Sequence, residues 1–155
     1  PVYVRMARAK FPVILPEDYQ FELGKAHLLA EGTDVSVFAC GVTVSAALEA
    51  RDELAKDGIS VEVVKVSTIK PLDAETLLRS AKKTGLVLTA EEHQVNGGLG
   101  SAVCELLSEN LPTRVLRVGV HDRYGQSGPA DRLLSEYGLD AAGMVSSIKR
   151  ALAGK

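Results

Sequence analysis

The sequence is short of three features that would each point to a particular class of protein. It has only two cysteines in 155 residues, Cys40 and Cys104, and both lie in apolar stretches, so we expect two separate thiols rather than a disulfide or a metal pair. No apolar run approaches the roughly 18 residues that a membrane-spanning helix needs. The formal net charge of −2 leaves no basic excess for binding nucleic acid. We therefore expect a cytoplasmic protein with no membrane or nucleic-acid partner.

Several catalytic motifs are also missing. The sequence has no G-x-x-x-x-G-K-[ST] loop to hold a nucleotide phosphate, and no nucleophile elbow for a Ser-His-Asp arrangement. Gly98 and Gly100 begin a G-x-G-x-x-G pattern, but Val103 stands in the place of the third glycine. These absences argue against nucleotide binding and against nucleophilic catalysis within this chain.

What is present is an alternation of strand-like and helix-like segments. Hydrophobic residues make up 46% of the sequence and charged residues 25%, and a chain of this length can bury the core of one domain. Apolar, β-branched runs alternate with stretches in which apolar residues recur at helical spacing. This alternation favours parallel strands joined by right-handed crossovers, and hence a three-layer α/β/α fold. The strands that we expect are residues 34–40, 60–66, 86–90 and 114–118.

Capping residues and glycines place the helices between these strands. Thr43 is the expected N-cap of a first helix, which ends near Lys56. Asp73 begins a second helix that Gly85 ends, and a third helix follows Gly100. After a polar loop, two more helices are expected at residues 130–137 and 140–153.

The first 22 residues differ from the rest of the chain. The run Val2–Met6 has strand character, but two prolines soon follow it, and proline removes a donor that a central strand needs. We interpret residues 1–22 as the end of a preceding domain with its linker, and residues 23–155 as the domain itself. Residues 23–30 have the pattern of a first short strand. Because the sequence begins without methionine, inside a strand-like run, we expect it to be a fragment.

The turn after the third of the expected strands holds the densest group of candidate residues. In open α/β sheets, ligands and partners gather at the carboxyl ends of the strands. Here the strand is followed by His93, beside two glutamates, and by Gly97, Gly98 and Gly100. A turn that passes close to a neighbouring backbone explains these glycines, and a role in that turn or in an interface explains His93.

A second candidate pair, His121 and Asp122, lies in the polar loop at residues 119–129. A histidine next to an aspartate could begin a metal site, but no third ligand has suitable spacing. We therefore expect a turn or an interface at this pair, and no metal.

Four stretches of the sequence resemble the C-terminal domain of the transketolase family of thiamine-diphosphate enzymes, over residues 31–152. They are GTDVSVFACG, SVEVVKVSTIKPLD, AEEHQVNGGLGSAV and GVHDRYGQSGPADRLLSEYGLDAAGM. The histidine of EEH followed by GGLG is more similar to transketolases than to deoxyxylulose-phosphate synthases. The resemblance implies a five-stranded, mostly parallel sheet in which residues 23–30 form an antiparallel edge strand. It also implies that residues 1–22 resemble the last strand and exit linker of a pyrimidine-binding domain.

The same resemblance implies a domain of an enzyme that moves a two-carbon ketol unit between sugar phosphates, in the pentose phosphate pathway, with thiamine diphosphate and Mg²⁺. In the family, a G-D-G motif in the N-terminal domain holds the diphosphate and Mg²⁺, and this sequence contains no G-D-G. The glutamate that activates the cofactor belongs to the pyrimidine domain. We therefore expect no cofactor-binding, metal-binding or catalytic residue in this chain, and no activity of the chain alone. It would serve assembly and dimer contacts with the remaining transketolase domains or subunit, in a homodimer of the complete enzyme.

One substrate contact is implied as well. Arg8, in VRMARAK, matches the arginine that in this family reaches the substrate phosphate. A guanidinium offers a planar pair of donors to a phosphate, which a lysine does not reproduce.

Other functions stay open on the sequence alone. The chain could be the C-terminal domain of a deoxyxylulose-phosphate synthase or of an oxo-acid dehydrogenase β subunit. A different class of function is a free-standing regulatory module that binds a small ligand at the strand ends.

Overall fold

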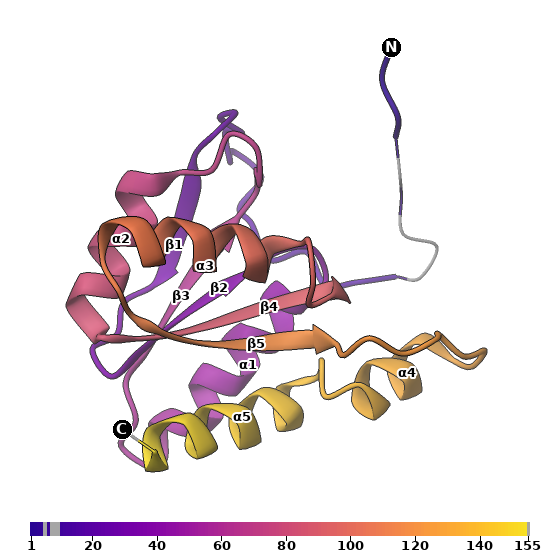
Figure 1. Cartoon of the computed structure of the whole chain (residues 1–155). Coiled ribbons are helices and arrows are strands. Elements are labelled where there is room, and N and C mark those ends of the chain that lie inside the picture. Colours follow the sequence, from indigo (N-terminus) through magenta and orange to yellow (C-terminus); the bar gives the residue numbers. More distant parts are fainter. Residues whose placement is uncertain (5, 7–9, 155) are drawn as a thin grey trace.

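The computed structural model of the chain describes residues 1–4, 6 and 10–154 (Figure 1). Within these residues, the strands are β1 (Ala26–Ala30), β2 (Val35–Ala39), β3 (Val61–Val66), β4 (Leu86–Gln94) and β5 (Arg114–Val120). The helices are α1 (Thr43–Ala55), α2 (Ala74–Thr84), α3 (Leu99–Asn110), α4 (Ala130–Glu136) and α5 (Ala141–Ala153).

The five strands form one sheet in the order β1-β3-β2-β4-β5. β1 runs antiparallel to β3, and the other three pairs are parallel. This confirms the expected five-stranded, mostly parallel sheet with an antiparallel strand at one edge. Every residue of the central strand β2 is buried, as the β-branched and apolar run VSVFA predicts.

Helices cover both faces of the sheet and enclose two separate cores (Figure 1). α1 and α5 pack against one face, where Val37, Leu54 and Met144 belong to the first core. α2 and α3 cover the other face, where Phe38 and Leu77 belong to the second core. Because β2 is buried on both sides, its successive residues Val37 and Phe38 face different cores.

Two local predictions were wrong. β4 continues to Gln94 instead of ending at residue 90, because β5 still pairs with it there after the pairing with β2 has ended at Ala90. Thr43 is the first residue of α1 and not its N-cap, which is Val42 with no side-chain capping bond. The Thr43 hydroxyl instead lies 2.9 Å from the Cys40 carbonyl oxygen and 2.8 Å from that of Ala90, and so joins the ends of β2 and β4.

The ends of α2 and the start of α5 agree with the expected signals, whereas α3 begins at Leu99 and contains Gly100 instead of following it. The Asp73 carboxylate accepts a hydrogen bond from the Thr76 amide at the start of α2, and Gly85 ends this helix in the left-handed conformation with φ of 67°. The Asp140 carboxylate caps α5 in the same way, through the Gly143 amide at 2.8 Å. The Asp73 and Asp140 carboxylates each satisfy a helix-start amide that has no partner within the helix.

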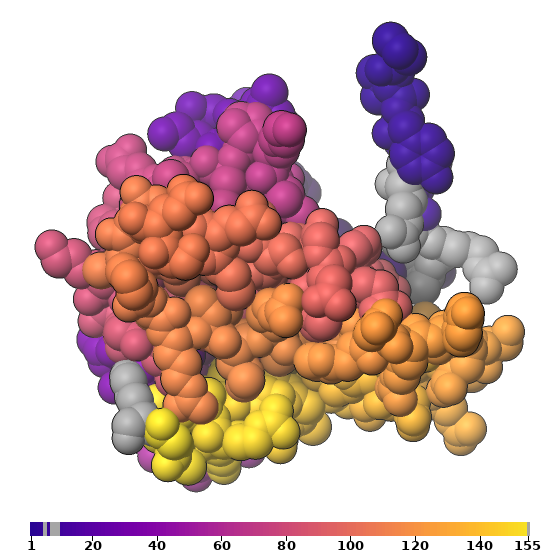
Figure 2. Space-filling view, viewed as in Figure 1, coloured from indigo at the N-terminus to yellow at the C-terminus, as the bar shows by residue number. Residues whose placement is uncertain are grey.

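The described residues before Ala26 contribute no strand to the sheet. Val2, Tyr3 and Val4 are exposed, and this end of the chain stands away from the body of the molecule (Figure 2). Closer to the domain, Ile14 packs against the first core. The Tyr19 ring meets the His27 ring edge-on, with the centroids 5.2 Å apart, so residues 14–19 are attached to the domain.

Candidate functional site

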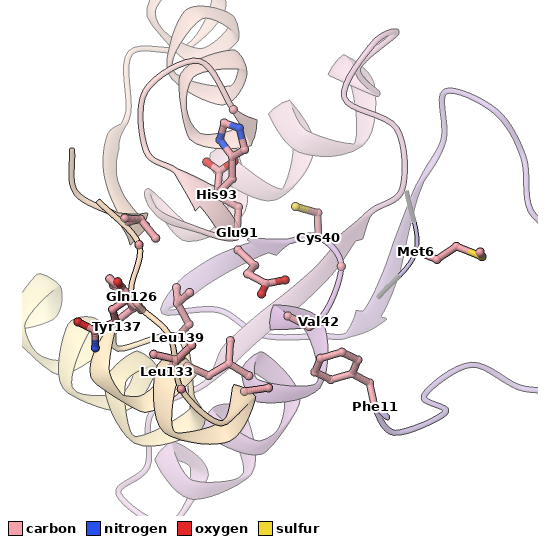
Figure 3. A pocket seen from close by; sticks show the side chains of 18 of the residues that line it. Met6, Phe11, Cys40, Val42, Glu91, His93, Gln126, Leu133, Tyr137 and Leu139 are labelled. Carbon is pink, nitrogen blue, oxygen red and sulfur yellow. The ribbon is translucent and has the colours of Figure 1, made fainter. Parts of the chain in front are cut away.

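A cavity of about 870 Å³ opens at the carboxyl-terminal ends of the parallel strands (Figure 3). One wall is formed by the strand ends, with Cys40 after β2 and Glu91 and His93 in β4. The opposite wall is mostly apolar and comes from α4 and the residues around it. Its main side chains are Leu133, Leu134, Tyr137 and Leu139.

The position of the cavity follows from the order of the strands. From β2 the chain crosses to β3 on one side, and later passes from β4 to β5 on the other side of β2. α1 therefore covers one face and α3 the other, and the loops that lead into these two helices diverge between β2 and β4. Such a point of divergence leaves a crevice at the carboxyl ends of the strands, where ligands and partners bind in open α/β sheets.

A buried carboxylate organises the turn between β4 and α3. Glu91 is 2% exposed, and its two carboxylate oxygens accept hydrogen bonds from the amides of Leu99 at 2.7 Å and Gly100 at 2.8 Å. The N-cap residue of α3, Gly98, has no side chain to supply such an acceptor. Glu91 therefore caps α3 from the neighbouring strand and places a negative charge at the positive end of the helix.

The three glycines of this turn make room for different neighbours. A Cβ atom on Gly98 would lie 2.0 Å from the Glu91 Oε2 atom and 2.9 Å from the His93 Nδ1 atom. A Cβ atom on Gly100 would lie 2.9 Å from the Thr89 Oγ1 atom. Gly97 has φ of +80°, which favours glycine. At Gly98 and Gly100, then, the close neighbours are side chains, and the expected approach to a backbone was wrong.

His93 lies within β4 and not beyond the strand, and its side chain is half-exposed at the cavity wall. Its Nδ1 atom is 2.7 Å from the Gln94 carbonyl oxygen, which fixes Nδ1 as the donor. The same atom is 3.8 Å from the Glu91 Oε2 atom. Because Nδ1 is engaged with the Gln94 carbonyl, Nε2 is the ring nitrogen that the half-exposed imidazole can present to a ligand or partner.

His121 and Asp122 do not join this group. Both are exposed in the loop that follows β5, and neither lines the cavity. The Asp122 amide donates to the Gln94 Oε1 atom at 2.9 Å, and the Gln94 Nε2 atom donates to the Arg123 carbonyl at 3.0 Å. Gln94 thus fixes the loop to the end of β4. Sequence reasoning missed Gln94, although a polar residue directly after His93 at the end of a strand was a usable signal.

Cys40 places a thiol at the wall of this cavity, within the electrostatic influence of Glu91. Burial, and then the negative charge of Glu91, raise the pKa of the Cys40 thiol to about 11. The thiol is therefore neutral near pH 7 and is a poor nucleophile or metal ligand. Cys40 and Cys104 are both free, as expected.

The chemistry of the lining separates the ligands that fit this cavity from those that do not. Among the described residues that line it, Glu91 and Glu92 supply carboxylates, and none is a lysine or arginine. Across the described part of the chain, no group of three or more histidine, cysteine, aspartate or glutamate side chains could hold a metal ion. A bare anionic phosphate group therefore finds no cationic side chain in the described lining, whereas an apolar group fits it.

Two further expectations concern parts of the chain away from this cavity. Arg8, the candidate for a contact with the substrate phosphate, lies outside the described residues. No helix in the described part of the chain is both long and apolar enough to cross a membrane.

Comparison with known proteins decides the family. The family model described as the transketolase C-terminal domain matches residues 24–144. The chain belongs to this family. The match covers all five strands and the turn that holds Glu91, so every lining residue of the cavity except Met6 and Phe11 belongs to the family's own domain.

Relatives with different names share this domain. The chain is 50% identical, over 145 residues and 94% of its length, to the 6-deoxy-6-sulfo-D-fructose transketolase subunit SqwH of Clostridium sp. strain MSTE9, and covers 45% of that protein. It is 44% identical over 138 residues, or 88% of its length, to 1-deoxy-D-xylulose-5-phosphate synthase 1 of Geobacter sulfurreducens, and covers 22% of it.

A solved structure agrees with the fold. The structure of a split gene transketolase, described as an inactive beta4 tetramer, is 46% identical, with a TM-score of 0.90 over 94% of this chain and 48% of that one. The chain thus spans less than half the length of each of these three proteins.

Proposed function

We propose that this chain is the C-terminal domain of a thiamine-diphosphate-dependent transketolase, an enzyme that moves a two-carbon ketol unit between sugar phosphates. The observation that carries the proposal is the 50% identity, over 94% of the chain, to a protein named as a transketolase subunit. The match to a split-gene transketolase at a TM-score of 0.90 supports it. The cofactor supplies the electron sink for breaking and forming the carbon–carbon bond.

Within such an enzyme, the role of this domain is assembly and not chemistry. The strand-end cavity carries carboxylates, and the Cys40 thiol is neutral near pH 7, so these groups neither hold a diphosphate nor attack a carbonyl. Thiamine diphosphate and Mg²⁺ would then bind to other domains of the enzyme. The chain alone would be inactive.

The partners would be the remaining transketolase domains or a complementary subunit. The similar split-gene transketolase is described as a beta4 tetramer that is inactive. This supports an enzyme whose activity needs a second type of polypeptide, and in which copies of this chain also associate, as in a homodimer of the complete enzyme. A cytoplasmic location, expected from the free cysteines, is part of the same proposal.

A reconstitution experiment tests this function. The full-length polypeptide that carries this domain is produced with its complementary subunit and assayed for ketol transfer between sugar phosphates, with thiamine diphosphate and Mg²⁺. We expect activity only when both polypeptides and the cofactor are present. Ketol transfer by the 155-residue chain alone, or its absence from the complete enzyme, would contradict the proposal.

A second candidate is a deoxyxylulose-phosphate synthase, which the 44% identity to the Geobacter sulfurreducens enzyme favours. The same preparation is therefore also assayed for formation of 1-deoxy-D-xylulose 5-phosphate. Formation of this product, in place of ketol transfer, would establish this second function.

Arg8 provides a sharper test within the complete enzyme. If its guanidinium contacts the substrate phosphate, its loss removes a charge-assisted interaction of about 1.5–3 kcal/mol. We expect Arg8→Ala to lower kcat/KM for a phosphorylated acceptor by about 10- to 150-fold. An unphosphorylated acceptor such as glycolaldehyde should lose far less, and equal losses for both acceptors would assign Arg8 to the fold or to an interface.

A further inference from the structure

The turn between β4 and α3 contains two residues that take no part in the capping of α3. Asn96 and Gly97 are consecutive, and both are exposed. The chain has one other asparagine, Asn110, and it is followed by Leu111. When glycine follows asparagine, no Cβ atom obstructs the attack of the glycine nitrogen on the asparagine side chain. The pair therefore marks a place where the chain can modify itself.

The turn around this pair is fixed at both ends. Before the pair, the Val95 amide donates to the Val120 carbonyl at 3.0 Å, and the Arg117 Nη1 atom donates to the Val95 carbonyl at 2.7 Å. After it, the Glu91 carboxylate holds two amides at the start of α3. The exposed pair lies between these two anchors, so its reactive groups keep their positions relative to their neighbours.

Two neighbouring side chains contact the atoms that would react. The Gly97 amide donates to the Ser101 Oγ atom at 2.8 Å, and this hydroxyl in turn donates to the Val95 carbonyl at 3.3 Å. Because Ser101 is only partly buried, its hydroxyl can relay the Gly97 amide proton to solvent. The Arg117 Nη1 atom lies 3.5 Å from the Asn96 Oδ1 atom. Attack on the side-chain carbonyl places negative charge on Oδ1, and a guanidinium beside it stabilises that charge.

We propose that Asn96 is a site of spontaneous deamidation and that the folded turn promotes the reaction. The Gly97 nitrogen gives up its proton and forms a bond to the Asn96 Cγ atom. The bond from Cγ to the side-chain nitrogen breaks, and that nitrogen takes up a proton and leaves as ammonia. Water then opens the resulting cyclic imide at either of its two carbonyls, which gives aspartate or isoaspartate. One water is consumed, one ammonia is released, and no group is oxidised or reduced.

The two products affect the turn differently. Aspartate at position 96 places a carboxylate next to Arg117 and keeps the length of the main chain. Isoaspartate adds a methylene group to the main chain before Gly97. The next residue, Gly98, is packed against Glu91, since a Cβ atom there would lie 2.0 Å from the Glu91 Oε2 atom. Isoaspartate therefore disturbs the cap of α3, and it marks the age of the protein whether or not the proposed function is correct.

Peptide mapping of the full-length polypeptide by mass spectrometry tests the inference. The protein is incubated in parallel in its native state and in urea, and the peptides that contain Asn96 and Asn110 are compared. Asn110 is the internal control, because the Leu111 amide that would attack it donates to the Leu107 carbonyl at 2.9 Å. In the native state, we expect Asn96 to deamidate at least about 10-fold faster than Asn110, with isoaspartate among the products. We also expect the native rate at Asn96 to be no lower than the rate in urea.

A pair of serine variants tests the part that the turn plays. Ser101→Ala removes the proton relay and should slow native deamidation at Asn96 several-fold, without changing the rate in urea. Ser108→Ala, at an exposed position on the same helix, should leave both rates unchanged.

Two results would overturn the proposal. If Asn96 deamidated in urea but persisted in the native protein, the turn would protect the pair instead of promoting its reaction. If Ser101→Ala deamidated as fast as the unsubstituted protein, the turn would have no part in the reaction. The comparison of Asn96 with Asn110 uses the unsubstituted protein, so it decides the first point even if a variant fails to fold.

Discussion

Two glutamates of this domain are almost completely buried, and they are satisfied in opposite ways. Glu62 is 1% exposed near the start of β3, and Glu91 is 2% exposed near the end of β4. They therefore lie at opposite ends of the parallel strands of the same sheet. Burying a carboxylate is costly unless it is paired or hydrogen-bonded, so each end must provide compensation.

For Glu62, side chains compensate for the burial of the carboxylate. Lys83 forms an ion pair with its carboxylate, and the Ser36 hydroxyl donates to its Oε1 atom at 3.1 Å. The Ser36 and Thr84 hydroxyl oxygens are 2.9 Å apart. Since Lys83 and Thr84 belong to the last turn of α2, this network joins that helix to the sheet.

For Glu91, the backbone compensates for the burial of the carboxylate, through two amides of α3. The arrangement leaves no space for a side chain at Gly98. It also leaves the negative charge of Glu91 next to Cys40 at the cavity wall, where it helps to raise the pKa of the thiol. The comparison shows that a charge paired by side chains acts on the packing of a helix, while a charge held by backbone continues to act on its surroundings.

The largest effect should come from breaking the side-chain pair. Lys83→Met leaves the Glu62 carboxylate buried without its cation, which costs about 3 kcal/mol, at the low end for a buried pair because Lys83 is itself partly exposed. Urea unfolding at neutral pH measures the loss. Glu31→Gln is the matched control, because Glu31 is the exposed partner of the same lysine and should cost about 0.2–1 kcal/mol. Equal losses would mean that burial of Glu62 does not matter.

The next effect concerns the thiol beside Glu91. With a pKa of about 11 in the folded protein, against an ordinary value of 9.0, Cys40 should be alkylated about 100-fold more slowly at pH 8 than an unperturbed thiol. The raised pKa also means that Cys40 makes its full contribution to the free energy of unfolding below pH 9. This contribution is lost as the pH rises from 9 to 11. Alkylation rates of a Cys104→Ser variant between pH 7 and 11 measure the pKa of the Cys40 thiol. A rate profile with its midpoint near pH 9 would rule it out.

Gly98→Ala should destabilise the domain by about 1–3 kcal/mol, because the new methyl group displaces either the Glu91 carboxylate or the start of α3. Gly125→Ala is the control, since a Cβ atom there meets nothing within 4 Å, and it should change stability by no more than about 0.5 kcal/mol. Thermal unfolding of both variants measures the two changes in stability. A tolerated Gly98→Ala would show that the turn can carry Glu91 in another geometry.

The smallest effect separates the two glutamates most directly. Glu91→Gln removes the charge next to Cys40 and should lower the pKa of the thiol, although burial, the larger cause, remains. Glu62→Gln, at the other end of the strands, should leave the Cys40 titration unchanged. The pH dependence of alkylation in the two variants gives the answer. A shift of similar size in both would mean that the variants act through the fold and not through charge.

The strands were predictable because the local composition of the sequence indicates their burial. Runs such as VSVFA and VEVVKV are apolar or β-branched over a whole strand length, and β2 and β3 lie where these runs are. The end of β4 was not predictable in this way. Glu91, Glu92 and His93 look like loop residues, and only the pairing of Gln94 with Val120 in β5 shows that the strand continues.

The candidate site was only partly accessible from sequence for the same reason. The glycine cluster marked the correct turn, but the partner that makes Gly98 necessary is a side chain seven residues earlier, on a different element. The contact between Gln94 and the loop joins residues separated by 28 positions. Lys83 and Glu62 are paired across two elements. Contacts of this kind depend on the three-dimensional arrangement and leave no local pattern.

The strand order also imposes a sequence of events on a chain that emerges from the ribosome. β2 pairs with β3 on one side and with β4 on the other, but β4 is made only after α1, β3 and α2. Until residues 86–94 emerge, one edge of β2 has no partner strand. That edge belongs to a strand that is fully buried in the finished domain. A stalled nascent chain that ends after α2 therefore exposes an apolar strand edge, which is a template for pairing with other chains.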